Sequence, residues 1–262
     1  MISIVITSFN RKHIIQRAID SAILFCKSLE VDFELIIVDD NSSDNTKEFI
    51  YSNYPKEIES ELIKYYYLKK NLGVTGAKNN GFFKAKYQWV VFLDSDDEMY
   101  LPSNQDFYKS LLKYNQYPIL FFRCIDQNKD FVGEKFDNDK ILDFKEYLNY
   151  SSYGEALTLI NKKIVFKRPY YTKLRGYEGL GCLDIIYKYK KAILVNVVAR
   201  VYYRDNHDRL SSFRNFIKRG NLLAKGHLLL LKRYSCFLPI KRKVKLIILS
   251  VVYFILNKLS KK

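Results

Sequence analysis

The sequence has no two cysteines close enough to act as a pair. Cys26, Cys124, Cys182 and Cys236 stand far apart, and none has CxxC spacing. This spacing argues against a zinc knuckle and gives no disulfide framework, so a reducing cytoplasm is the expected compartment. The first residues, MISIVITSFN, form a strand-like run with no basic stretch before it, and we therefore expect no secretory signal.

Two phosphate-binding loops are also missing. The chain has no GxxxxGK[ST] motif, which a P-loop NTPase requires. It has no GxGxxG after its first apolar run, where TSFNRKH stands instead, so a Rossmann dehydrogenase is disfavoured. A phospho-receiver domain is disfavoured because it is much shorter than these 262 residues. Internal repeats and low-complexity segments are absent as well.

Acidic residues are scarce at the C-terminal end. From residue 200 to residue 262, 16 Lys and Arg stand against two acids, and the whole chain carries a net charge of +16. The basic charge therefore belongs to a tail. Because the chain has no recognised nucleic-acid motif, we expect no nucleic-acid partner.

The tail also lacks an apolar run long enough to span a bilayer. Its apolar stretch, 246–256, is well short of the ~20 residues that a spanning helix needs. Lysines and arginines flank it at 241–245 and 258–262, and the helix expected over 213–234 is basic too. This pattern is typical of a helix lying in an anionic membrane surface. A helix packed on its own domain is the alternative.

What the chain does contain is an alternation of strand and helix patterns. Apolar residues make up 48% of the sequence and aromatic residues 16%, which indicates a folded core. Strands are expected over 2–7, 33–40, 63–68 and 88–94, and helices over 11–29, 42–54 and 73–86. The alternation predicts an α/β fold with a mostly parallel sheet and helices on both faces. Residues 100–205 are less regular, with a strand over 117–124 and a glycine-rich loop, a helix and one or two strands over 174–204.

Three polar clusters directly follow predicted strands. They are TSFN (7–10), DDNSSD (39–44) and DSDD (94–97). Ligands of such sheets bind at the carboxyl ends of the strands. Exit to solvent explains one cluster, but it explains two acid clusters after buried strands poorly. Asp94 and Asp96, spaced i, i+2, can offer oxygen ligands to one Mg²⁺ or Mn²⁺ ion.

Four segments together resemble a glycosyltransferase of the GT-A fold, family 2, of the bacterial surface-polysaccharide type. They are ISIVITSFNRKHIIQRAIDSAI, LIIVDDNSSDNT, NLGVTGAKNNGFFKAKYQWVVFLDSDD and the later CLDIIYKYKK with VYYRDNHDRLS. The match is ordered over residues 2–97 and looser to about residue 212. It implies inverting transfer of a sugar from a nucleotide-sugar donor, with Mn²⁺ or Mg²⁺ as cofactor.

The resemblance assigns roles on the donor side. Thr7, Ser8 and Asn10 would line the nucleotide pocket. Asp39 and Asp40 would contact the base and ribose, and carboxylates at a strand end can accept such hydrogen bonds. Asp94 and Asp96 would hold the metal against the donor diphosphate, and Ser95 between them would contribute to donor binding. Lys78 stands where the family often has Arg, and Lys cannot form a bidentate fork, so a solvated helix residue is the alternative for it.

On the acceptor side, the resemblance implies a general base at the start of a helix. Asp184 is the expected base, although Leu183 stands where the family commonly has Glu, and Glu178 in GYEGLG is the rival. His207 would reach the metal. Arg209, or less readily Arg204, would pair with the diphosphate.

We therefore expect a metal-dependent transferase that moves a sugar, from a UDP-sugar first of all, to a glycan or lipid-linked glycan. Its setting would be the inner face of the cell membrane. We expect a nucleotide-sugar half at 1–100, an acceptor half at 101–212 and a basic membrane-associating tail at 213–262. A non-catalytic nucleotide-sugar-binding or scaffold protein that keeps the fold is the alternative.

Overall fold

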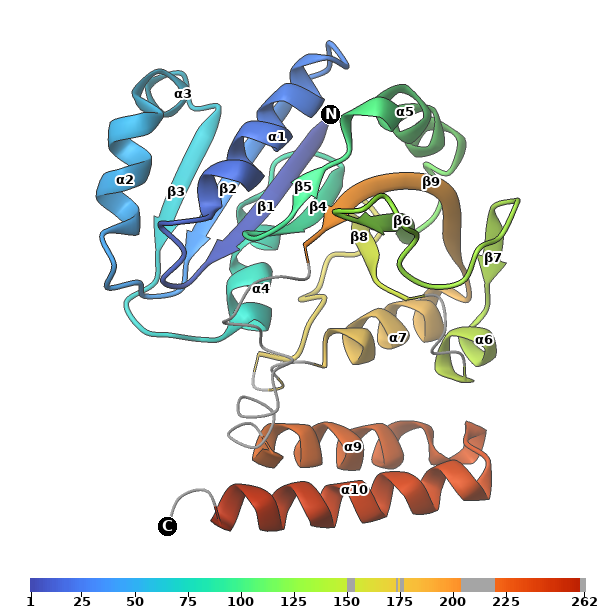
Figure 1. Ribbon diagram of the computed structural model, residues 1–262. Coiled ribbons are helices and arrows are strands. Elements are labelled where there is room, and N and C mark those ends of the chain that lie inside the picture. The colour runs from blue at the N-terminus through green and yellow to red at the C-terminus, as the bar shows by residue number, and fades with distance from the viewer. Residues whose placement is uncertain (150–153, 173, 175–176, 204–219, 260–262) are drawn as a thin grey trace.

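A computed structural model of the chain describes residues 1–149, 154–172, 174, 177–203 and 220–259 (Figure 1). The strands are β1 (Ile2–Ser8), β2 (Phe33–Asp39), β3 (Ile63–Tyr67), β4 (Trp89–Asp94), β5 (Glu98–Met99), β6 (Ile119–Asp126), β7 (Lys140–Leu142), β8 (Ala156–Asn161) and β9 (Ala192–Tyr202). The helices are α1 (Ile15–Lys27), α2 (Thr46–Asn53), α3 (Pro55–Glu59), α4 (Val74–Lys84), α5 (Asn104–Lys113), α6 (Phe144–Asn149), α7 (Glu178–Tyr189), α9 (Gly220–Tyr234) and α10 (Ile240–Leu259).

The strands form one sheet in the order β3-β2-β1-β4-β8-β6-β9-β5, and β7 pairs with β9. The neighbours from β3 to β4 are parallel, as the strand–helix alternation predicted. Beyond β4, β8 runs antiparallel to both of its neighbours, while β6 and β9 are parallel. The α/β fold class is confirmed, and β5, β7 and β8 are additions that the sequence pattern did not reveal.

Helices cover both faces of the sheet, which explains why its central strands are apolar at every position. In β1, Ile4 and Ile6 belong to the core under α1, α2 and α5, whereas Val5 belongs to the core on the opposite face. That opposite face carries α4, α6, α7 and the C-terminal helices. The contact of α4 with β1 is close, since a Cβ on Gly81 would lie 2.3 Å from Cγ1 of Val5. Only glycine fits there.

The two C-terminal helices, α9 and α10, lie side by side and form a further layer below α7 in Figure 1. We call them the C-terminal hairpin. Leu230 and Tyr234 of α9 are buried in the core. The helix also packs closely on Tyr177, because a Cβ on Gly226 would lie 2.5 Å from the Tyr177 ring. Of the helices in the described residues, none is both long and apolar enough to cross a membrane.

The outer helix α10 turns its apolar side outward. Its buried residues are Leu246, Ser250 and Asn257, two of which are polar. The large apolar side chains of this helix that remain 40% exposed or more are Ile240, Val244, Ile247, Ile248, Val251, Val252, Phe254, Ile255 and Leu259. A helix that only packs on its own domain buries its apolar stripe, so this arrangement leaves a large apolar surface to be explained.

Candidate active site

The sheet brings the three polar clusters of the sequence to one edge. Because β1 lies between β2 and β4, its last residues are next to both neighbouring strand ends. Ser8 stands opposite Asp39 in β2, and Thr7 stands opposite Asp94 in β4. Residues about 90 positions apart in the chain thus meet at the carboxyl ends of parallel strands, which is where such sheets bind ligands.

Asp94 is the centre of a charge network at this edge. Nζ of Lys78, from α4, lies 2.9 Å from Oδ1, and Nη1 of Arg200, from β9, lies 3.3 Å from Oδ2. Burial raises the pKa of Asp94, but the two cations more than offset this and leave the pKa below its usual value. Lys78 is therefore a buried ion-pair partner and not a solvated helix residue.

The same arginine also binds the next acid of the cluster. Nη1 of Arg200 lies 3.2 Å from Oδ2 of Asp97, which is 1% exposed. Burial raises the pKa of Asp97 to about 7, even though Arg200 works against this shift. Ser95 is buried beside them, and the backbone carbonyl of Asp96 accepts a hydrogen bond from Nη2 of Arg17.

The loop after β1 is joined to the loop after β2 through Asn10. Its backbone N–H donates to Oγ of Ser42 at 2.9 Å, and its Oδ1 accepts from the N–H of Ser43 at 2.8 Å. Oγ of Ser8 is buried and has no hydrogen-bond partner in the described part of the chain, and the same holds for Oγ1 of Thr75 in α4. Buried hydroxyls without partners are uncommon, and a bound ligand would satisfy them.

The acids of the second cluster are occupied by bonds within the protein. Oδ1 of Asp39 accepts the N–H of Ser42 at 2.6 Å, and its Oδ2 accepts the hydroxyl of Tyr65 at 2.5 Å. Asp40 accepts the N–H groups of Leu72 and Gly73 at 2.6 and 2.7 Å. Both acids are at the strand end where the sequence predicted them. Their oxygens shape the surrounding loops, which limits their capacity for direct contacts with a base or ribose.

The two candidate bases on α7 lie in different surroundings. Glu178 begins the helix and is close enough to Lys78 to raise its pKa, which burial alone would lower. The charge of Glu178 thus acts on Lys78, the partner of Asp94. Asp184 accepts hydroxyl groups of Tyr171, at 2.5 Å, and Tyr234, and Nη2 of Arg233 lies 3.2 Å from its Oδ2. The structure brings Glu178 toward the network and ties Asp184 to the C-terminal hairpin.

These features gather donors, acceptors and acids at the edge where a nucleotide-sugar was expected. A match to the family described as Glycosyl transferase family 2 covers residues 3–174. The chain belongs to this family. It is a glycosyltransferase, and the resemblance seen in its motifs is confirmed.

Two relatives of this glycosyltransferase act on lipid-linked substrates by name. The chain is 30% identical over 236 residues to the UDP-Glc:alpha-D-GlcNAc-diphosphoundecaprenol beta-1,3-glucosyltransferase WfaP of Escherichia coli, across 85% of each protein. It is 28% identical over 228 residues to the GalNAc(5)-diNAcBac-PP-undecaprenol beta-1,3-glucosyltransferase of Campylobacter jejuni, across 82% of this chain and 69% of that one.

A solved structure shares the fold. The mannosyltransferase PcManGT from Pyrobaculum calidifontis, in complex with GDP-Man and Mn²⁺, superposes with a TM-score of 0.64 and 12% identity. The superposition covers 96% of this chain and 73% of that one. The GT-A fold expected from the motifs is thus observed.

The oxygen donors at the edge of the sheet suit a hard divalent cation only in part. Within the described ranges, no three His, Cys, Asp or Glu side chains are grouped so that they could hold a metal ion. Asp94 and Asp96 supply two carboxylates, and such ions commonly complete their shell with water and substrate phosphates. Because Lys78 and Arg200 already face Asp94, a bound ion would share that carboxylate with them.

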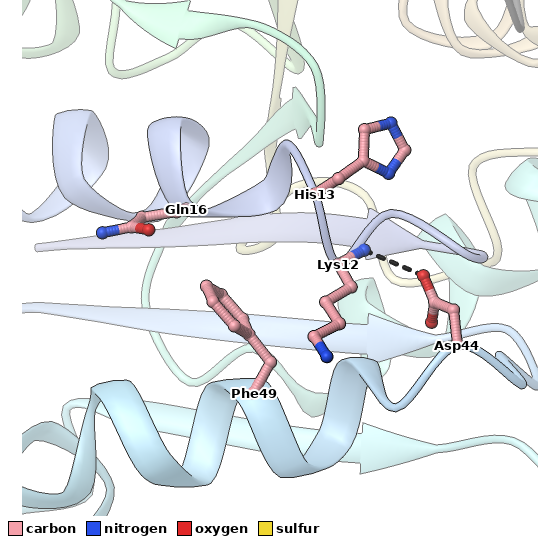
Figure 2. Close-up of a pocket in the computed structure, with 5 residues that line it drawn as sticks. All are labelled: Lys12, His13, Gln16, Asp44 and Phe49. Carbon is pink, nitrogen blue, oxygen red and sulfur yellow. Dashed lines mark hydrogen bonds between the residues drawn. The ribbon is translucent and has the colours of Figure 1, made fainter.

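A cavity lies near the same edge, between the start of α1 and the start of α2 (Figure 2). It measures about 430 Å³ and is lined by Lys12, His13, Gln16, Asp44 and Phe49. The N–H of Lys12 donates to Oδ2 of Asp44 at 2.9 Å and so ties the two loops together. The sequence gave no signal for this cavity.

The sequence predicted that Arg209, or less readily Arg204, pairs with the diphosphate, and those residues, like His207, lie outside the described residues. It missed Arg200, the cation that joins Asp94, Asp97 and Glu155. The available signal was a single arginine inside the apolar strand sequence AILVNVVARVY.

Proposed function

We propose that this glycosyltransferase moves a sugar from a UDP-sugar to a lipid-linked glycan with inversion at the anomeric carbon. The observation that carries the proposal is the network of Asp94, Lys78 and Arg200 at the carboxyl ends of β1, β2 and β4. The three polar clusters at the ends of these strands meet at that edge. Together they offer the hydrogen-bond donors and acceptors that a nucleotide diphosphate and its sugar require.

The relatives support the stereochemistry and the donor. One of them is named for UDP-Glc and for a beta-1,3 product. UDP-glucose carries its glucose in the α configuration, so a β product requires inversion in a single displacement. A direct displacement needs one base for the acceptor hydroxyl and a stabilised leaving group, without a covalent sugar–enzyme intermediate.

On the donor side, Thr7, Ser8 and Asn10 would line the nucleotide pocket, with Asp39 and Asp40 fixing its loops. Asp94 and Asp96 would hold Mn²⁺ or Mg²⁺, and Ser95 would stay packed behind them. Bound there, the ion would neutralise negative charge on the diphosphate. The Mn²⁺ bound to the mannosyltransferase that shares the fold supports this assignment.

The chain supplies positive charge of its own. Lys78 and Arg200 are buried within 3.3 Å of Asp94, so both would face the leaving diphosphate. His207 and Arg209 remain proposed donor-site residues from the family resemblance.

On the acceptor side, we assign the general base to Glu178. A base must accept a proton, and its carboxylate must be free to approach the acceptor hydroxyl. Asp184 is held by two tyrosines and an arginine, and these contacts would keep its carboxylate turned away from the reaction. Asp184 is better suited to anchor the C-terminal hairpin to α7.

The hairpin would attach the enzyme to the inner face of the cell membrane. The exposed apolar residues of α10 would enter the headgroup region, and Lys241, Lys245 and Lys258, all exposed, would meet anionic lipids. In this arrangement residues 1–100 bind the donor, 101–212 bind the acceptor and 213–262 hold the enzyme at the membrane. Surface polysaccharide assembly is the setting that fits a lipid-linked acceptor.

A nucleotide-sugar panel tests the proposal. Thermal unfolding of the full chain is followed with UDP-Glc, UDP-GlcNAc, GDP-Man and free UDP, each with Mn²⁺ or with a chelator. We expect stabilisation by UDP compounds only when Mn²⁺ is present, and transfer of the bound sugar to GlcNAc-diphospho-undecaprenol. The absence of any metal-dependent shift with all four compounds would contradict the proposal.

A further inference from the structure

A cavity of about 470 Å³ lies between α6, α7, the sheet and the C-terminal hairpin. Its walls are largely apolar and include Leu148, Leu183, Leu230 and Leu246. Two charged side chains also line it, Glu178 and Arg242. Apart from Glu178, none of its lining residues was expected from the sequence to bind a ligand.

Glu178 connects this cavity with the donor site. It lines the cavity and also raises the pKa of Lys78, whose Nζ lies 2.9 Å from Asp94. A molecule in the cavity would therefore present its near end to Glu178 while a donor lies against Asp94. The cavity is in the right place for an acceptor.

Arg242 is a cation whose partners in the described part of the chain are all neutral. Its Nη1 donates to the backbone carbonyl of Leu148 and, at 3.2 Å, to Oδ1 of Asn149. No carboxylate of the described residues forms an ion pair with it, and burial lowers its pKa. This half-buried guanidinium is fixed by neutral oxygens, and its Nε and Nη2 have no partner among the described residues. Such a group is well suited to bind an anion.

The far end of the cavity adjoins the apolar surface of the hairpin. Leu246 closes the cavity from α10, and on the opposite side of the same helix Ile248, Val251 and Ile255 are each at least 50% exposed. An amphiphile whose hydrocarbon chain lies in a bilayer against the apolar side of α10 could therefore place its polar end in the cavity on the other side of this helix. Arg242, on the same helix as this apolar surface, and Glu178, on α7, both line the cavity.

We propose that the cavity is the site of the acceptor and that Arg242 binds its phosphate. This assignment rests on the proposed function, which supplies the class of acceptor. The acceptor sugar would lie in the cavity with its hydroxyl at Glu178, the lipid-linked diphosphate would pair with Arg242, and the lipid chain would leave along α10. Arg242 thus selects acceptors that carry a phosphate next to the sugar.

The test measures binding of undecyl diphosphate, below its micelle concentration, to the full chain by calorimetry. Arg242→Gln removes the charge but keeps a hydrogen-bond donor for Leu148 and Asn149. Lys145→Gln removes the same charge from an exposed residue of α6 and is the matched control. We expect at least about tenfold weaker binding in Arg242→Gln and less than a twofold change in Lys145→Gln. Equal losses in both variants, or no loss in Arg242→Gln, would overturn the assignment.

Two further arms make the result specific. Inorganic diphosphate should bind at least about tenfold more weakly than undecyl diphosphate, because it cannot use the apolar walls. Equal affinity of the two would overturn the lipid part of the assignment. If Arg242→Gln unfolds, Arg242→Lys replaces it, with a several-fold loss expected from the missing fork; wild-type affinity in that variant would count against the assignment.

The donor arm separates this inference from the proposed function. UDP affinity in Mn²⁺ should be the same in wild type, Arg242→Gln and Lys145→Gln, and a loss confined to Arg242→Gln would contradict a role on the acceptor side. If no UDP-sugar binds or reacts but undecyl diphosphate still binds through Arg242, the proposed function fails and the anion site stands. If UDP-sugars react and undecyl diphosphate does not bind, the inference alone fails.

Discussion

At the scale of single residues, the two acids of α7 show how surroundings divide roles between identical groups. Glu178, at the first position of the helix, acts electrostatically on Lys78, which pairs with Asp94. Asp184, further along, satisfies two tyrosine hydroxyls and Arg233. A carboxylate with three donors stabilises the fold, whereas one beside a reaction centre can take a proton.

Exchanging each acid for its amide separates these roles. Glu178→Gln should lower kcat by roughly 10²–10⁴-fold with UDP affinity nearly unchanged, because a base acts on the chemical step. Asp184→Asn should cost about 1–3 kcal/mol of stability through weaker hydrogen bonds, with kcat changed only a few-fold at a temperature where it is folded. Steady-state kinetics and thermal unfolding of both variants decide this. A large loss of kcat in Asp184→Asn at unchanged stability would return the base to Asp184.

The site residues that the sequence predicts differ from those it does not predict in the kind of contact that brings them to the site. Thr7, Asp39 and Asp94 end apolar strands, and parallel strands bring such ends together without further information. Arg200 belongs to the site because it contacts Asp94, which lies 106 positions earlier in the sequence. Its strand, β9, pairs with β6 in a register that shifts at Phe122, Arg123 and Cys124. Packing of this kind has no local signature, and neither has the preference for Glu178 over Asp184.

At the scale of elements, the contact of α9 with Tyr177 controls how the hairpin docks. A Cβ on Gly226 would lie 2.5 Å from the Tyr177 ring, whereas a Cβ on Gly179 would meet its nearest atom, the Tyr147 hydroxyl, at 3.7 Å. Both glycines lie inside helices. They therefore form a matched pair in which only one is required by packing.

Alanine at each glycine tests the docking. Gly226→Ala should lower the free energy of unfolding by about 1–3 kcal/mol because of overpacking against Tyr177. Gly179→Ala should leave it unchanged or raise it by up to about 1 kcal/mol through helix propensity. Chemical denaturation measures both. Equal effects of the two substitutions would show that α9 does not pack on Tyr177 in solution.

His227 makes the same docking sensitive to pH. It lies between the rings of Tyr177 and Tyr253, and its Nδ1 has no hydrogen-bond partner among the described residues. Burial lowers its pKa below the usual value of about 6.5. Between the lowered pKa and 6.5 the unfolded chain binds more protons, so His227 destabilises the fold as the pH falls below about 6.5.

Removing the imidazole should remove this contribution. We expect the loss of unfolding free energy between pH 7.5 and pH 5.5 to be smaller in His227→Phe, which keeps a ring between the tyrosines. His13→Gln, at an exposed histidine, should follow wild type. Urea unfolding at both pH values gives the comparison. An unchanged pH dependence in His227→Phe would mean that His227 is protonated freely in the folded chain.

At the scale of the whole molecule, the sheet lies on one side of the hairpin and the outer side of α10 lies on the other (Figure 1). The proposed membrane surface on α10 thus lies on the far side of the hairpin from the sheet. Of the basic residues after residue 199 that the structure describes, Arg200 belongs to the proposed donor edge and the others lie on the C-terminal hairpin.

Flotation with anionic liposomes tests that surface. Wild type should float at low salt and be released only in part at high salt, because salt screens the lysines but not the apolar contacts. Ile248→Ser, Val251→Ser and Ile255→Ser combined should stay largely unbound, each change removing on the order of 1 kcal/mol of apolar burial. Leu24→Ser with Leu112→Ser, at exposed leucines of α1 and α5, should float like wild type. If the triple variant floated as well as wild type at both salt concentrations, the membrane assignment would be contradicted.

The most direct test of the donor site is Asp96→Asn. This change removes one anionic oxygen ligand and keeps the size of the side chain, while the ion pairs of Asp94 with Lys78 and Arg200 are left in place. The measurement is Mn²⁺-dependent turnover of UDP-glucose, with thermal unfolding as the control for folding. We predict that Asp96→Asn unfolds at the wild-type temperature and has lost Mn²⁺-dependent turnover. Near-wild-type turnover in Mn²⁺ would contradict the account, because the acids at the end of β4 would then not hold the metal against the donor.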